Sequence, residues 1–316
     1  MQVVRLEPWP TGRRTAPPAV VAIGNFDGVH RGHQALVGAA RDQAAARGEV
    51  CLALTFDPHP AVVLNPERAP RSLTTLSQKA ELLSALGIDV LAVLPFTSAL
   101  ASLAPADFAV RILVGPLGAR AVVVGEGFRF GKARGGDVAE LQRLGRDLGF
   151  EVVPVSAVLQ DGLPVSSTRV RECLLRGDVT AAAALLGRAY FVEGKVVRGD
   201  GRGRTLGIPT ANLAAENEIL PKEGVYAARA ARGDEVPGHP AVVNIGRRPT
   251  FGGATVTTEA HLLDFEGDLY DQRLRVSFQA RLRDERAFAG GEALRAQIQD
   301  DVAAARRVLA QEGDGV

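Results

Sequence analysis

The sequence has 316 residues, of which 46% are hydrophobic and 23% are charged, and its formal net charge at pH 7 is +1. This composition is typical of a globular protein of two ordinary domains, and the low charge excludes a strong attraction to nucleic acid or anionic membranes. No apolar run is long enough to span a bilayer, and residues 1–7 lack the apolar core of a signal peptide. We therefore expect a cytoplasmic protein whose two cysteines, Cys51 and Cys173, are reduced.

In the first half of the chain, short apolar runs alternate with segments of helical pattern. The apolar runs predict strands at 19–23, 50–56, 90–94, 121–125 and 151–155. Helical patterns cover the intervening segments 79–86, 106–113 and 138–148. Continuous apolar strands separated by helices predict a Rossmann-like α/β domain, in which a parallel sheet is covered on both faces. Polar residues follow the strand ends at 24–33, 57–60 and 125–136, at the edge where such sheets bind ligands.

The stretch 24–33, which follows the first of these strands, contains three glycines, an aspartate and two histidines. A strand, a glycine-rich turn and a helix start form a common phosphate-binding corner. His30 and His33 are three residues apart, so at a helix start they lie on the same side. For this pair alone, a turn with two solvated histidines is favoured by roughly four to one. The surrounding glycines and Asp27 lower those odds.

Three further loops carry residues suited to a nucleotide. Residues 55–60 combine an acid and a histidine with two prolines, and residues 125–132 combine glycines, aromatic rings and cations. Residues 166–171 place hydroxyls and arginines before a helix. Taken singly, the first of these loops is equally well explained as a rigid strand exit, and the last is better explained as a helix cap. Together with residues 24–33, the three loops favour a nucleotide site.

The pattern changes near residue 187. Short β-type runs broken by glycine and proline predict strands at 191–197, 224–230, 241–245, 255–263 and 274–283. Such closely spaced short strands predict a small antiparallel barrel, and the helical pattern at 291–309 predicts a closing helix. The alanine-rich helical piece at 171–186 is interpreted as a bridge between two domains. We place these domains at residues 1–186 and 187–316.

A loop dense in glycine and arginine, residues 194–212, lies at the start of the predicted barrel. Its composition fits a disordered basic loop and a phosphate-binding loop equally well, but its end, Leu206 to Asn212, favours an ordered segment. Thr210 and Asn212 are two apart, so on a strand their oxygens point to one face and could share a cation such as Mg²⁺.

The four loops of the first half resemble the N-terminal module of the prokaryotic bifunctional riboflavin kinase/FAD synthetases. That module belongs to the HxGH nucleotidylyltransferases, whose motif matches residues 30–33. The resemblance implies transfer of AMP from ATP to the FMN phosphate, with pyrophosphate leaving. It implies catalytic roles for His30, His33 and Arg171. Further ATP-binding residues implied are Gly24, Phe26, Asp27, Ser167 and Thr168. Residues implied on the flavin side are Phe56, Asp57, Phe128 and Arg129.

The second half resembles the riboflavin kinase module of the same family, with its PTAN signature at 209–212 and further matches at 224–226, 244–252 and 259–270. The resemblance implies phosphorylation of riboflavin by Mg²⁺–ATP, with Glu259 as the base for the 5′-hydroxyl and Thr210 and Asn212 as metal ligands. Without the resemblance, Glu259 would be taken for an exposed strand carboxylate. ATP-binding residues implied are Gly194, Lys195, Gly199, Arg204, Gly207 and Thr210. Flavin-binding residues implied are Asn244 and Arg248.

One position departs from the family pattern, which usually has Asn or Asp where this chain has Gly127. The missing polar group leaves an alternative, in which the chain is a riboflavin kinase whose N-terminal domain binds nucleotide or flavin but adenylylates poorly or not at all. A second alternative treats the arginines of residues 198–204 as an RNA-contacting arm, against which the low net charge and the lack of interleaved aromatic residues speak. The expected partners are therefore riboflavin, FMN and ATP, with no nucleic acid and no membrane, while self-association is left open.

Overall fold

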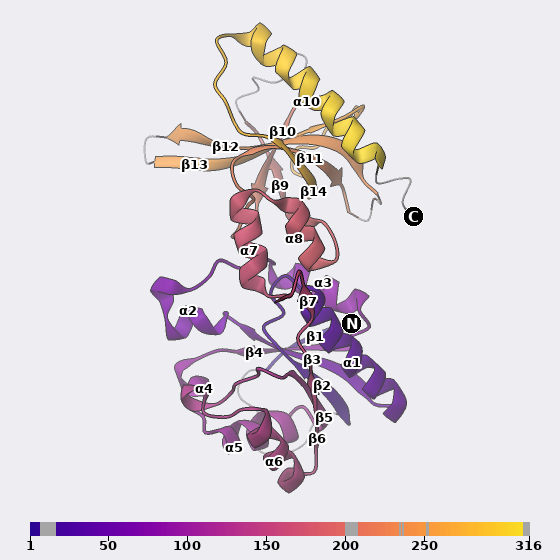
Figure 1. The fold of residues 1–316 in the computed structure, drawn as a ribbon, viewed down its shortest axis with the longest axis vertical. Coiled ribbons are helices and arrows are strands. Elements are labelled where there is room, and N and C mark those ends of the chain that lie inside the picture. The colour runs from indigo at the N-terminus through magenta and orange to yellow at the C-terminus, as the bar shows by residue number, and fades with distance from the viewer. Residues whose placement is uncertain (7–16, 200–207, 234, 236, 251–252, 312–316) are drawn as a thin grey trace. The chain divides into compact units, whose positions relative to one another are not determined.

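The computed structural model describes the chain except residues 7–16, 200–207, 234, 236, 251–252 and 312–316, and within 248–255 it describes no side chains. The described residues form two compact units, Met1–Ser166 and Ser167–Val316 (Figure 1). This division reflects how the residues pack and says nothing of their chemistry. The functional boundary between residues 186 and 187 therefore stays a prediction.

The first unit is built on a six-stranded parallel sheet of strand order β1-β4-β3-β2-β5-β6. Its strands are β1 (Gln2–Arg5), β2 (Ala19–Ile23), β3 (Val50–Asp57), β4 (Val90–Pro95), β5 (Ala119–Gly125) and β6 (Glu151–Val155). The chain runs outward from β2 through β3 to β4 and then returns to place β5 on the other side of β2. This reversal puts a topological switch point at the carboxyl ends of β2 and β5, where open α/β sheets bind their ligands.

Alternation along β2 supplies both faces of the sheet with apolar side chains. Val20 and Ala22 belong to one core cluster, together with residues of α1 (Arg31–Arg47) and α3 (Leu76–Ala85). Val21 and Ile23 belong to a second cluster, with residues of α4 (Ser98–Ala101), α5 (Pro105–Phe108), a π-helical segment (Ala109–Val114) and α6 (Val138–Leu148). The predicted parallel sheet covered on both faces is confirmed. Smaller elements are α2 (Pro60–Leu64), two 3₁₀ turns (Pro66–Arg68 and Lys132–Arg134) and the hairpin β7 (Leu159–Gln160) and β8 (Leu163–Pro164).

The second unit contains a closed antiparallel barrel of strand order β10-β13-β12-β11-β14-β9 (Figure 1). Its strands are β9 (Tyr190–Val197), β10 (Ala211–Ala215), β11 (Gly224–Ala231), β12 (His239–Thr250), β13 (Gly253–Leu262) and β14 (Arg273–Arg283). Tyr226 and Phe278 are fully buried and meet edge to face, at 5.4 Å between ring centroids. Helices α7 (Ser167–Arg176) and α8 (Val179–Leu186) precede the barrel in this unit.

The C-terminal helix α10 (Gly291–Gln311) packs on the outside of the barrel, as the sequence predicted. Ala305 and Leu309 share a core cluster with Val225 of β11 and Val242 of β12. An ion pair fixes the helix to β14: Arg283 donates from Nη2 to Oδ2 of the buried Asp301 at 2.7 Å. In the described part of the chain, no helix is both long enough and apolar enough to cross a membrane.

Two candidate active sites

The turn between β2 and α1 is shaped by residues with left-handed backbone. Phe26, Gly28 and Val29 have φ values of 48°, 78° and 41°. The Phe26 ring is fully buried under the turn, and a Cβ on Gly24 would lie 3.2 Å from that ring. The glycine therefore permits the close approach of backbone and ring that folds the turn.

The two predicted histidines meet at the start of α1. The His30 ring caps the helix, because its Nδ1 accepts a hydrogen bond from the His33 backbone N–H at 3.3 Å. The two rings stack with 3.7 Å between their centroids, and the Phe26 ring meets His33 edge-on at 5.4 Å. The pKa of His33 is lowered well below 6.5 by its burial, by the neighbouring His30 and by the positive charge of Lys79. Two imidazoles beside the N–H groups of a helix start can donate hydrogen bonds to phosphate oxygens.

Asp27, expected to contact ATP, has contacts within the protein. It is 4% exposed, and its Oδ1 accepts hydrogen bonds from the backbone N–H groups of Leu73 at 2.9 Å and Thr74 at 3.2 Å. These bonds fasten the β2–α1 turn to the segment before α3. The role of Asp27 toward ATP stays a prediction.

A polar chain that we did not predict from the sequence lies beside this turn. Lys79 of α3 donates from Nζ to Thr55 Oγ1 at 3.4 Å, and Thr55 donates to the backbone carbonyl of Asn25 at 3.1 Å. The Asn25 amide lies 3.1 Å from Nε2 of His59. The sequence held a signal for Lys79, which takes an apolar position of the helical stripe that continues at Ala80 and Leu83.

The flavin-side residues predicted in the first unit lie at the carboxyl ends of β3 and β5. The Phe56 ring meets Phe96 edge to face at 5.7 Å, and Phe128 stacks on Phe130 at 5.6 Å. Both charged members have partners: Asp57 accepts from Arg5 at 3.2 Å, and Arg129 lies 3.6 Å from Asp137. The aromatic rings thus lie at the ends of two strands that flank β2, with charged side chains beside them.

Gly127, the position that departs from the family pattern, lies exposed after β5. A Cβ at this position would meet nothing within 4 Å, and the backbone is not in the left-handed region. The neighbouring Glu126 accepts a hydrogen bond from Ser156 Oγ at 2.7 Å. The backbone therefore leaves room for the side chain that the family usually has here.

Ser167, Thr168 and Arg171 lie in the first turns of α7, which belongs to the second compact unit. The joint action of these residues with His30 and His33 stays a prediction.

In the second unit, strand register brings three predicted residues into one row. Glu259 of β13 is paired with Asn212 of β10 on one side and with Asn244 of β12 on the other. Paired residues of neighbouring strands project to the same face of a sheet. Residues Thr258 and Ala260, on either side of Glu259, are buried, so Glu259 faces outward from the barrel.

Three neighbours complete this row. Thr210, just before β10, donates from Oγ1 to Glu259 Oε2 at 3.4 Å. Gly199 packs against the Asn212 amide so closely that a Cβ there would lie 2.3 Å from Asn212 Nδ2. At the far end, Asn244 donates to Glu285 Oε1 at 3.4 Å. The row therefore presents hydroxyl, carboxylate and amide groups within reach of one bound molecule.

The remaining predicted residues of the second unit are placed as follows. Gly194 and Lys195 lie on β9, where Lys195 forms an ion pair of 2.8 Å with Asp271. Arg204 and Gly207 lie outside the described residues, as does the side chain of Arg248 on β12. Their predicted roles stay predictions.

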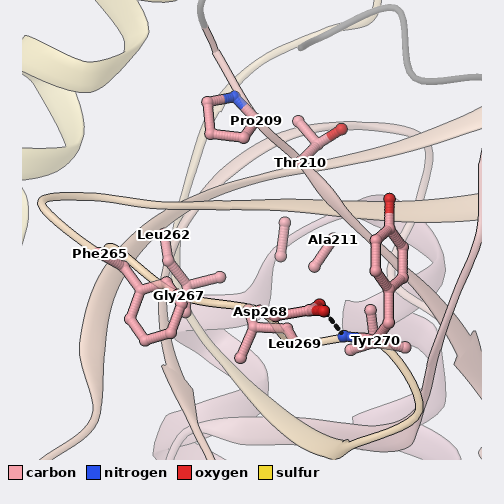
Figure 2. Close-up of a pocket in the computed structure, with 11 residues that line it drawn as sticks. Pro209, Thr210, Ala211, Leu262, Phe265, Gly267, Asp268, Leu269 and Tyr270 are labelled. Atoms are coloured by element: carbon pink, nitrogen blue, oxygen red, sulfur yellow. Dashed lines mark hydrogen bonds between the residues drawn. The ribbon is translucent and has the colours of Figure 1, made fainter.

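A pocket opens beside Thr210. Figure 2 shows Pro209 and Thr210 along one part of it and the segment from Leu262 to Tyr270 around another. Its wall includes the rings of Phe265 and Tyr270, and Arg198 lies 5.5 Å from the centre of the Tyr270 ring. Aromatic and aliphatic walls next to the polar row are suited to a planar ring whose polar substituents reach Thr210.

Comparisons with known proteins agree for both halves of the chain. Residues 13–169 match the family model of FAD synthetase, and residues 186–309 match that of riboflavin kinase. The chain is 44% identical over 294 residues to a bifunctional riboflavin kinase/FMN adenylyltransferase of Pseudomonas fluorescens, covering 92% of this chain and 93% of that protein. It is 38% identical over 287 residues to a protein of the same description from Escherichia coli K12, covering 91% of each.

The fold also has a solved counterpart along its whole length. A crystal structure described as a macrolide-efflux protein from Streptococcus pneumoniae superimposes with a TM-score of 0.87 at 28% identity. The match covers 97% of this chain and 99% of that one.

The lowered pKa of His33 makes stability depend on pH. The unfolded chain binds a proton near pH 6.5, whereas folded His33 stays neutral at that pH, so stability falls as the pH drops below 6.5. We expect wild-type protein to lose at least about 1 kcal/mol more than His33→Asn between pH 7 and pH 5. Urea unfolding of both proteins at the two pH values measures this difference. Equal losses would contradict a His33 that stays neutral in the folded protein.

Proposed function

The chain belongs to the family of bifunctional riboflavin kinase/FMN adenylyltransferases, and from this premise we propose how its two halves divide the chemistry. The enzyme phosphorylates riboflavin to FMN and transfers AMP from ATP to FMN, forming FAD and pyrophosphate. We assign the first reaction to residues 187–316 and the second to residues 1–186.

The observation that supports the kinase site is the row formed by Asn212, Glu259 and Asn244. We assign Glu259 as the base that orients the 5′-hydroxyl of riboflavin. In a loose phosphoryl transfer, such a carboxylate accepts the hydroxyl proton late, while the hydroxyl oxygen bonds to the γ-phosphorus and ADP leaves. We assign Asn244, which is paired with Glu259 across the strands, to the flavin. The pocket beside Thr210 then takes the adenine end of ATP.

The metal in this proposal is Mg²⁺ bound with ATP. Thr210 and Asn212 offer uncharged oxygens next to the Glu259 carboxylate, and Thr210 Oγ1 is 3.4 Å from it. Oxygen donors of this kind fit Mg²⁺, which commonly takes one or two protein ligands and fills the rest with phosphate and water. Within the described ranges, no group of three or more His, Cys, Asp or Glu residues could hold a metal by itself. When bound, the ion would neutralise charge on the phosphates.

The adenylylation site in this proposal centres on the β2–α1 turn. An FMN phosphate oxygen attacks the α-phosphorus of ATP, and the bond to the β-phosphate breaks as pyrophosphate leaves. The N–H groups at the start of α1 and the imidazoles of His30 and His33 stabilise the charge that grows on pyrophosphate. Ser167, Thr168 and Arg171 hold the triphosphate as well.

On the flavin side of the same site, we assign four residues to FMN: Phe56, Asp57, Phe128 and Arg129. Their rings and charges flank two strand ends of the first unit. The relatives named above are bifunctional, which supports adenylylation over the alternative of a kinase alone. A cytoplasmic location and partners limited to small molecules stay predictions. Whether the chain associates with itself is left open.

Two substitutions separate the reactions. Glu259→Ala removes the proposed base, so FMN formation from riboflavin should fall by about a thousandfold while FAD formation from supplied FMN is retained. His30→Ala should lower FAD formation by about a hundredfold and spare FMN formation. Separate assays of the two half-reactions check this. His30→Asn, which keeps a helix cap, controls for lost stability. Loss of both reactions in either folded variant would contradict the two-site assignment.

The open space at Gly127 allows a gain-of-function test. Gly127→Asn should raise kcat/KM for FAD formation about threefold to tenfold, because a polar group would again help to hold the substrates. Gly127→Ala is the matched control, since it adds the Cβ without the amide. Equal rates for the two variants, or a lower rate with Asn, would contradict the proposed contribution of a polar side chain at this position.

A further inference from the structure

A buried lysine of the first unit has no part in the assignments above. Lys79 is 9% exposed and lies on α3 between Leu76 and Leu83, which pack against the sheet. An apolar residue would complete this stripe, and replacing buried charge by well-packed apolar groups is often neutral or stabilising. Stability of the helix therefore gives no reason for a lysine at this position.

The Lys79 ammonium is only weakly compensated. Within the described residues, its one hydrogen bond goes to Thr55 Oγ1, at 3.4 Å, and no carboxylate lies within 4.0 Å of Nζ. Asp27 and Asp57 are the acids whose charges act on it, and burial lowers its pKa. Asp27 is bonded to the backbone of Leu73 and Thr74, and Asp57 is paired with Arg5. An ammonium has three donors, so this one retains hydrogen-bonding capacity at the edge of the site.

Thr55 connects this charge to the ATP side of the site. The Thr55 hydroxyl accepts from Lys79 and donates to the backbone carbonyl of Asn25, at 3.1 Å. Asn25 lies in the β2–α1 turn, three residues after Ala22 of the sheet core and before the helix that His30 caps. Through Thr55, the β2–α1 turn is thus connected by hydrogen bonds to the Lys79 ammonium on α3.

Asn25 continues the connection to the flavin side. Its side-chain amide lies 3.1 Å from Nε2 of His59, and Nδ1 of His59 accepts from the backbone N–H of Ala61 at 3.2 Å. His59 follows Asp57 in the loop after β3. One polar chain, Lys79–Thr55–Asn25–His59, therefore links the loops proposed to hold ATP and FMN.

Lys79 also acts on a histidine of the site. The titratable groups that face His33 are His30, from its own turn, and Lys79, from α3, while Phe26 supplies an apolar edge. Both charges lower the pKa of His33. A cation at position 79 thus adds to the larger effect of burial in lowering the pKa of His33.

We propose that Lys79 is a positioning residue for adenylyl transfer, anchoring a polar chain that holds the ATP-side turn and the flavin-side loop in one geometry. This inference rests on the proposed assignment of FAD formation to the first unit. The reaction joins two anions, so a small displacement of either loop misaligns the attacking oxygen and the α-phosphorus. The residue acts through Thr55 and Asn25 and needs no contact with substrate.

The test compares Lys79→Met, Lys79→Arg, Thr55→Val and the Lys79→Met/Thr55→Val double variant in the full-length enzyme. Glu81→Gln is the matched control, because it removes an exposed charge from the same helix. We expect Lys79→Met to lower kcat/KM for FAD formation at least about tenfold without lowering the unfolding midpoint. Riboflavin phosphorylation by the same preparations should stay within about twofold of wild type.

Three further readouts distinguish positioning from simple packing. The double variant should be no more than about twofold worse than Lys79→Met, since both changes break one chain. Lys79→Arg, which keeps the charge, should recover most of the lost rate. NMR titration of the histidine rings should show a higher pKa for His33 in Lys79→Met than in wild type. If Lys79→Met does not fold, the near-isosteric Thr55→Val tests the same chain.

The inference and the proposed function fail under different results. Lys79→Met within about twofold of wild type in FAD formation, or losses that multiply in the double variant, would overturn the inference. If Lys79→Met does not fold, Thr55→Val within about twofold of wild type would overturn it as well. A wild-type enzyme that phosphorylates riboflavin but forms no FAD from supplied FMN would refute the proposed function instead, so the two failures are separable.

Discussion

The proposed adenylylation site of the first unit is shaped by one hydrogen bond, from the His33 backbone N–H to Nδ1 of His30. It caps α1, closes a turn whose backbone is left-handed at Phe26, Gly28 and Val29, and stacks the two imidazoles. A helix start left with free N–H groups attracts anions, and two imidazoles beside it add donors that can respond to a charge growing during reaction. The histidine that shapes the turn is therefore also a group proposed for the chemistry.

In the second unit, the register of antiparallel strands brings the proposed site residues together. Pairing of β13 with both β10 and β12 places Asn212, Glu259 and Asn244 in one row, although they lie far apart in sequence. A slip of one residue would turn Glu259 toward the barrel interior, where Thr258 and Ala260 are buried. Packing of the barrel thus specifies the position of Glu259, the proposed base.

The sequence alone predicted both fold classes, because apolar runs and their spacing carry the strand pattern. It gave no range for β1 or β10: β1 is a short, exposed edge strand, and β10 begins at the end of the glycine- and arginine-rich segment. Motifs indicated His30, His33 and Glu259, whose roles stay predictions. No motif indicates Lys79, and a lysine in a helix usually lies on the surface. For Asp27, the motif did not predict the contacts within the protein. Its hydrogen bonds go to Leu73 and Thr74, which lie far away in the sequence.

The central claim is that one chain carries out two consecutive ATP-dependent reactions at two separate sites. The most direct measurement is a time course of products from riboflavin, ATP and Mg²⁺ with the purified wild-type enzyme, resolved by chromatography. We predict that FMN appears first and that FAD and pyrophosphate then accumulate at its expense. FMN as the sole flavin product, with no pyrophosphate released even when FMN is supplied, would contradict the account.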